Sequence, residues 1–243
     1  MIARLLASRF LVAFSLGQLL DASSVHAETP APSPLPADLA SPLAAFRAEG
    51  SWGWAFTQST AADGKSLVER YDPARLDFHR WALVEKDGRA PTAKELEDYR
   101  QQQTRRSGGL TAPNVKDQID PTSAALVVDD GTRATWRFGL VPGGFDDSSA
   151  AHMAVEFTLH RPTQTIERVE LASFEPFSPV LGVKIKEART TLHYTLPTGD
   201  RPTLLLNVAM RVRGRAFWFK SLDSDLTITY TDHTYAGKVV PVP

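Results

Sequence analysis

Apolar and polar residues alternate along most of the chain from residue 52 onward. Trp52, Trp54 and Phe56 are separated by small or polar residues, a pattern typical of a strand with one buried face. We expect about ten strands, because further short runs share this period of two. Besides the run that begins at Trp52, they cover residues 66–71, 80–86, 124–129, 132–141, 151–160, 165–174, 183–196, 203–215 and 225–230.

Short turn sequences separate many of these runs. Asp63-Gly64, Asp87-Gly88 and Asp130-Gly131 favour tight turns, and residues 197–201 link two later strands as a hairpin. Such links are too short to carry a crossover helix. They therefore favour an antiparallel meander over a parallel α/β sheet.

One segment, 91–106, predicts the main helix. Thr92 and Glu95 have the spacing of a capping box, in which the Thr hydroxyl and the Glu carboxylate each accept from a backbone amide of the first turn. Leu96 and Tyr99 then lie along one side at helical spacing, and most other positions are charged or polar.

The predicted fold class is mainly β (α+β). We expect a curved antiparallel sheet or incomplete β-barrel of about ten strands, with the 91–106 helix packed against its concave side. The apolar stripe of the helix needs a partner, and a bent sheet supplies one. The alternative is a closed up-and-down barrel.

The first residues follow the three-part layout of a secretory signal. Arg4 and Arg9 precede an apolar run over 10–20, and Val25 and Ala27 supply the small residues of a cleavage site. We expect cleavage after Ala27 and a periplasmic or secreted protein with no later transmembrane span; the alternative is an uncleaved N-terminal anchor. The predicted organisation is a signal peptide at 1–27, a Pro/Ala-rich extended tether at 28–49 and one β-rich domain at 50–243.

Composition removes several classes of function. The chain has no cysteine, which excludes disulfides, thiol catalysis and zinc–cysteine or iron–sulfur sites. Its 27 Lys and Arg residues are balanced by 28 Asp and Glu residues, so no basic field for nucleic acid is expected.

No catalytic, metal or cofactor motif emerges. His152 and His160 lie eight residues apart on one predicted strand, too far to share a metal ion. No GxSxG elbow, GxGxxG loop or phosphate-binding loop occurs. We therefore predict no catalytic residue, no metal site and no cofactor, and keep a hydrolase as one alternative.

The candidate ligand-binding residues are apolar or basic. The segment 174–183 contains two prolines and cannot form a regular central strand, so it is either a binding lid or a plug across the end of the sheet. Three arginines alternate over 211–215 and precede three consecutive aromatic residues. The predicted set is Phe174, Phe177, Val180, Leu181, Leu96, Tyr99, Trp218, Arg211, Arg213 and Arg215.

A resemblance extends these expectations. The segment from Tyr71-Asp72-Pro73 through Arg80-Trp81 and Asp87-Gly88 to Tyr99-Arg100 resembles a recurrent segment of exported proteobacterial proteins. The order of strands, embedded helix and long meander over 52–230 is similar to the periplasmic lipoprotein-carrier superfamily, which includes LolA, LolB and RseB. That resemblance implies an open barrel with a helical lid over an acyl-chain cavity. The layout carries no binding residue over, and a chain without cysteine departs from the lipid-anchored LolB form.

The predicted function is a periplasmic, non-enzymatic binding or carrier protein for an apolar or acylated ligand, such as a lipid. The alternative is an envelope protein-interaction or regulatory module without a ligand cavity. A cavity of about 300 Å³ or more beneath the 91–106 helix would favour the carrier. A large exposed apolar patch would favour the interaction module.

Overall fold

The computed structural model describes residues 35–48, 52–76, 79–105, 118–141, 147–217 and 219–237. The predicted signal peptide, its cleavage site and the first part of the predicted tether lie outside these residues.

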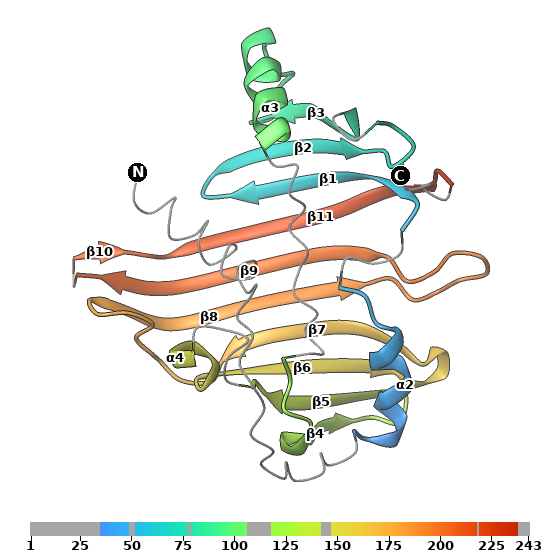
Figure 1. The fold of residues 1–243 in the computed structure, drawn as a ribbon, viewed down its shortest axis with the longest axis vertical. Helices are drawn as coiled ribbons and strands as arrows, with labels where there is room; N and C mark the ends of the chain where they lie inside the picture. The colour runs from blue at the N-terminus through green and yellow to red at the C-terminus, as the bar shows by residue number, and fades with distance from the viewer. Residues whose placement is uncertain are drawn as a thin grey trace, which may run out of the picture.

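Eleven antiparallel strands form one sheet that does not close on itself (Figure 1). The spatial order is β3-β2-β1-β11-β9-β8-β7-β6-β5-β4, and β10 pairs with β9. The strands are β1 (Trp54–Ala62), β2 (Lys65–Tyr71), β3 (Trp81–Lys86), β4 (Ala125–Asp129), β5 (Arg133–Gly139), β6 (Met153–His160), β7 (Thr165–Ser173), β8 (Val183–Tyr194), β9 (Leu205–Ala216), β10 (Lys220–Ser221) and β11 (Ser224–Tyr235). The mainly β, antiparallel fold class is thus confirmed. The closed barrel is wrong, because β3 and β4 remain as separate edges.

The predicted tight turns have the required backbone. Asp63 and Gly64 between β1 and β2, like Asp87 and Gly88 after β3, have consecutive positive φ angles of 50° and 74°, and 51° and 76°. Two successive positive φ angles are what a two-residue hairpin turn of the type favoured by Asp-Gly needs. The first of these turns sets the register in which β1 pairs with β2.

The predicted helix is α3 (Ala93–Arg105), and its capping box is formed. The Thr92 hydroxyl accepts from the Glu95 amide at 3.3 Å, and the Glu95 carboxylate accepts from the Thr92 amide at 2.9 Å. Hydrogen bonds from Arg89 and from this amide hold the pKa of Glu95 well below its usual range. The helix α3 lies at the β3 end of the sheet (Figure 1), where Tyr99 donates to Glu69 of β2, so the predicted packing of one main helix against the sheet is confirmed.

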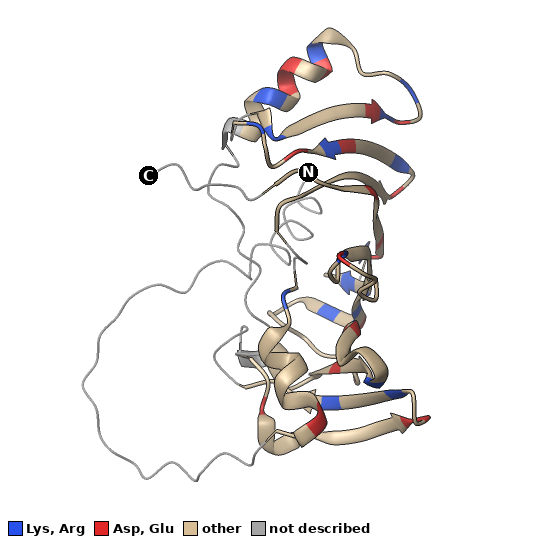
Figure 2. Cartoon of the chain, turned by 90° about the vertical axis from the view of Figure 1, so that its right-hand side faces the viewer, with Lys and Arg blue, Asp and Glu red and all other residues tan. Residues whose placement is uncertain are grey.

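A second helix, α2 (Ala37–Ala45), corrects the prediction of an extended tether over 28–49. The prolines of that segment argued against a helix, but Pro36 precedes the first helical residue, where no amide donor is required. Leu39 and Leu43 lie four residues apart on one face of α2 and are 0% and 2% exposed. Figure 2 shows α2 packed against the lower half of the bent sheet.

The main core lies between α2 and strands β5 to β9. Phe157 of β6 is at its centre and makes edge-to-face contacts with Phe46 after α2 and with Phe138 of β5. The Tyr194 hydroxyl donates to the Ala48 carbonyl at 2.9 Å and fastens the chain that leaves α2. Three short turns complete the described elements: η3 (Pro121–Ser123), α4 (Asp147–Ala150) and η4 (Arg161–Thr163).

Candidate functional site

Two turns lie side by side at one end of the sheet. One is the 174–182 link between β7 and β8, and the other is the turn between β9 and β10. Because β8 begins where β9 ends, Val183 pairs with Ala216, and the Phe217 amide donates to the Gly182 carbonyl at 2.7 Å. A Cβ atom at Gly182, whose φ is +81°, would lie only 3.0 Å from the Phe217 ring. The two turns are thus in direct contact.

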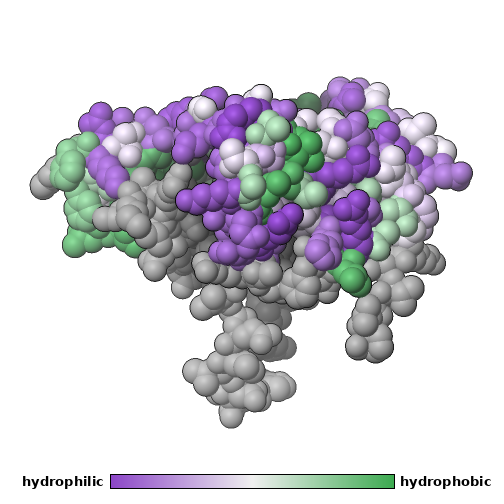
Figure 3. Space-filling model, turned by 90° about the horizontal axis from the view of Figure 1, so that it is seen from above, coloured by the Kyte–Doolittle hydropathy of each residue, from purple (hydrophilic) through white to green (hydrophobic). Residues whose placement is uncertain are grey.

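These turns display apolar side chains to solvent. Leu181 is 98% exposed, Phe219 82%, Phe217 61% and Val180 54%. We call these four residues the apolar tip. Figure 3 shows apolar residues gathered on the left, the side on which Figure 1 places β10. Contiguous exposed apolar groups of this kind mark binding surfaces more often than isolated ones do.

The 174–182 link is anchored by Phe177. This side chain is buried, and its ring stacks on His152 with centroids 5.5 Å apart. The backbone of Phe177 exchanges hydrogen bonds of 3.0 and 2.8 Å with Ile185. Phe177 therefore acts as a plug, whereas Phe174, Val180 and Leu181 of the same link face solvent.

The arginines near the tip differ in their partners. Arg211 and Arg213 bind the Asp225 carboxylate at 3.2 and 2.6 Å. The hydrogen bond from Arg213 is the main reason why the pKa of Asp225 is lowered. Arg215 is exposed, and within the described residues no carboxylate lies within 4.0 Å of it. Its cross-strand partner is Lys184, a second cation in the same situation.

The other predicted ligand-binding residues do not join this surface. Leu96 and Tyr99 belong to α3, at the β3 edge of the sheet. Tyr99 is buried, and its hydroxyl donates to Glu69 at 2.6 Å. Trp218 lies outside the described residues. The predicted set therefore contains residues of the two touching turns together with two residues of α3, which lies at the β3 edge of the sheet.

Sequence reasoning missed a second cluster of aromatic residues next to α3. The ring of Phe56 lies 5.0 Å from Tyr71, 5.8 Å from Trp81 and 5.3 Å from Tyr230. Glu69, 5% exposed, lies among these strands and accepts from Tyr99 and from Gln58. The alternation of β1 and β2 carried this signal, because Phe56 and Gln58 face Tyr71 and Glu69 in register.

Titration of Tyr230 should destabilise this cluster at alkaline pH. Burial, with a smaller contribution from the Glu69 charge, raises the pKa of Tyr230 to about 12. An unfolded tyrosine has a pKa of about 10. The folded state holds the proton more tightly, so the stabilisation is complete below pH ~10 and is lost as the pH rises through about 12.

The free energy of unfolding should decrease as the pH rises from ~8 to ~12, and we expect this decrease to be smaller in Tyr230→Phe by roughly 1–3 kcal/mol. Urea unfolding at a series of pH values in this range measures the free energy of unfolding of each protein. Tyr235→Phe, at an exposed position of the same strand, is the control and should show the same decrease in the free energy of unfolding as the wild type. An unchanged profile in Tyr230→Phe would contradict the assignment.

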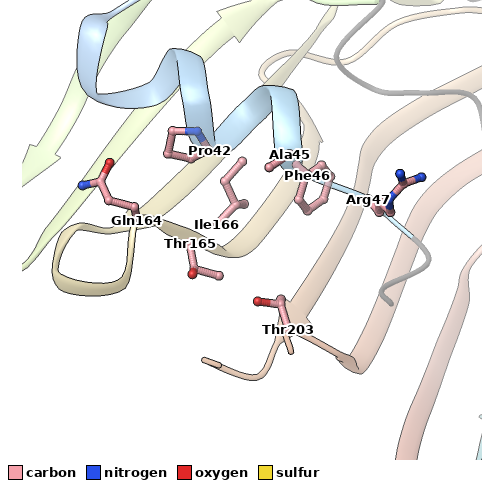
Figure 4. Close-up of a pocket in the computed structure, with 8 residues that line it drawn as sticks. All are labelled: Pro42, Ala45, Phe46, Arg47, Gln164, Thr165, Ile166 and Thr203. Atoms are coloured by element: carbon pink, nitrogen blue, oxygen red, sulfur yellow. The ribbon is translucent and has the colours of Figure 1, made fainter. Parts of the chain in front are cut away.

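A cavity of about 200 Å³ lies at the end of α2, remote from the tip (Figure 4). Its lining residues are Pro42, Ala45, Phe46, Arg47, Gln164, Thr165, Ile166 and Thr203. Sites for small organic ligands usually have about 300–1,000 Å³. This cavity is thus smaller than such sites, and it lies at α2 rather than beneath α3.

The buried charge of Glu170 in β7 is compensated by two arginines. Glu170 is buried and accepts from Arg168, Arg189 and Thr191. Since both guanidinium groups reach one carboxylate, this cluster fastens β7 to β8. Within the described ranges, no group of three or more His, Asp or Glu side chains is placed to hold a metal ion.

None of the helices in the described part of the chain has the length and apolar character needed to cross a membrane.

Comparisons with known proteins assign this chain to no family. No family model matches the chain. No curated protein matches it either. One solved structure, titled "GphF DH1 P1711L, L1744P variant: An isomerase-inactive variant of GphF DH1", aligns with 84% of this chain and 82% of its own, at 10% identity and a TM-score of 0.19. A TM-score this low does not indicate a shared fold.

Proposed function

We propose that this protein is a non-enzymatic binding protein that recognises an apolar group, such as the acyl chain of a lipid or of an acylated partner, through its apolar tip. The observation that carries the proposal is the exposure of four apolar side chains on two touching turns. Covering a leucine or phenylalanine side chain gains about 1.5–3 kcal/mol. The tip therefore offers a favourable contact to any apolar partner.

The tip is held in place before a partner arrives. Phe177 anchors the first turn in the core, and the Phe217–Gly182 hydrogen bond fastens the second turn to it. Turns whose backbone is already fastened lose little backbone conformational entropy on binding. This supports recognition by the tip rather than simple exposure of a loose loop.

The geometry favours recognition at the surface over enclosure of a ligand. A carrier of the predicted kind would hold an acyl chain in a cavity beneath the 93–105 helix. The cavity found at α2 is smaller than usual ligand sites and partly polar, with Arg47, Gln164 and two threonines in its lining. The proposal includes a periplasmic or secreted location for the protein, as predicted from residues 1–27.

Binding of an uncharged acyl probe tests the proposal. Monomeric dodecyl maltoside, titrated into the protein and followed by calorimetry, should bind the wild type. Leu181→Ser/Phe219→Ser should weaken that binding at least ~100-fold, because two large apolar contacts are lost. Both side chains are exposed, so the fold should be unaffected.

The matched control is Leu76→Ser/Val84→Ser, which changes exposed apolar residues outside the tip. It should bind the probe as the wild type does. Absence of binding by the wild type, or equal loss in the two double variants, would overturn the proposed function.

A further inference from the structure

Two cations stand directly opposite each other beside the apolar tip. Lys184 of β8 and Arg215 of β9 are cross-strand partners, and both side chains are exposed. Directly opposed side chains on adjacent strands lie about 4.5–5.5 Å apart at Cβ, so like charges there repel. Within the described residues, neither side chain has a carboxylate within 4.0 Å.

The same two strands show how such repulsion is relieved elsewhere. Arg189 and Arg211 are also cross-strand partners. In that pair, Arg189 binds Glu170 and Arg211 binds Asp225. The uncompensated pair is thus the one next to the tip, where an external anion can approach it.

A third cation lies on the other side of the tip. Lys220 of β10 follows Phe219 directly, and its cross-strand partner is Ala216. Phe217 and Phe219 are consequently flanked by Arg215 before them and Lys220 after them. Apolar rings between cations match a surface whose polar layer is anionic and whose interior is apolar.

We propose that the apolar tip docks on an anionic lipid bilayer, with its apolar side chains entering the headgroup–acyl boundary and Lys184 and Arg215 contacting lipid phosphates. This inference rests on the proposed function and names the partner of the tip. The two turns project at one end of the sheet, as the nearly complete exposure of Leu181 shows. A projecting apolar tip can enter the headgroup–acyl boundary of a flat bilayer.

Vesicle flotation with the full chain tests this inference. The protein should float with vesicles of phosphatidylglycerol and phosphatidylcholine, and far less with vesicles of phosphatidylcholine alone. A basic residue near an anionic bilayer contributes about fivefold to binding, so Lys184→Gln/Arg215→Gln should weaken binding about 30-fold. The control Lys94→Gln/Arg201→Gln removes the same charge at exposed positions outside the tip and should lose little.

Two further measurements separate the apolar contribution to vesicle binding from the electrostatic contribution. Leu181→Ser/Phe219→Ser should also lose vesicle binding, and inorganic phosphate at millimolar concentration should not compete. All variants keep residues 10–20, so differences between them report on the tip and not on that apolar run.

Three results would overturn the inference: equal binding to neutral vesicles, equal losses in the two charge variants, or full competition by free phosphate. If the protein does not bind vesicles while dodecyl maltoside still binds at the tip, the inference of an anionic bilayer as the partner is wrong, and the proposed function stands. If both fail, the proposed function falls as well.

Discussion

Phe157→Ala should destabilise the folded protein by about 3–5 kcal/mol, the loss typical of a phenylalanine removed from a closed core. The Phe157 side chain is 0% exposed, and its ring lies 6.1 Å from Phe46 and 6.0 Å from Phe138. Its removal would leave a void between α2 and the sheet that neither neighbour can fill without leaving its own position. Denaturant unfolding of the wild type and the variant measures the difference.

Phe219→Ala is the matched control, because it removes the same atoms from an exposed position of the tip. We expect its free energy of unfolding to stay within about 0.5 kcal/mol of the wild type. A large loss in Phe157→Ala and almost none in Phe219→Ala would show that the Phe219 side chain does not contribute to the stability of the fold. Similar losses in both variants would mean that the tip packs against the rest of the protein instead of projecting into solvent.

Leu39→Ala should cost about 2–5 kcal/mol of stability. The Leu39 side chain is completely buried in the main core, although the segment around it has the composition of a linker. The loss would show that α2 is part of the folded domain. Unfolding of the variant should remain a single cooperative transition, because α2 and the sheet share one core.

Ser41→Ala, at an exposed position of the same helix, serves as the control and should leave stability unchanged or slightly raised. If Leu39→Ala behaves like Ser41→Ala, α2 does not contribute to the core, and residues 37–45 act as an independent tether after all.

Local sequence signals predicted the elements well. The alternation of β6 and the Asp-Gly turns indicated strands and hairpins at the right places, and Thr92 and Glu95 marked the start of α3. These signals depend on residues close together in the chain. They are therefore readable without knowledge of the fold.

Contacts between distant residues could not be predicted in this way. The last strand, β11, inserts between β9 and β1, which brings Tyr230 to Phe56. The helix α2 forms because Leu39 and Leu43 meet a core built from strands that lie far later in the chain. Composition alone favoured an extended chain there, and tertiary burial overrode it.

For the candidate site, local signals identified the segments involved but not the contacts between them. The unusual composition of 174–183 and the aromatic run after Arg215 singled out both turns of the tip. Only the β8–β9 register shows that these turns touch, and that Lys184 stands opposite Arg215. Tyr99 was predicted to bind a ligand because it lies on a helical stripe, whereas the fold uses it to bind Glu69.

A spin-labelled acyl probe, added to isotope-labelled protein, tests most directly whether the tip is the binding surface. The label broadens the NMR signals of amides near the bound probe. We predict selective broadening at Val180, Leu181 and Phe219, with little change around the cavity formed by Phe46, Ile166 and Thr203. Broadening centred on that cavity, with the tip signals intact, would contradict recognition by the tip and would favour an enclosed carrier.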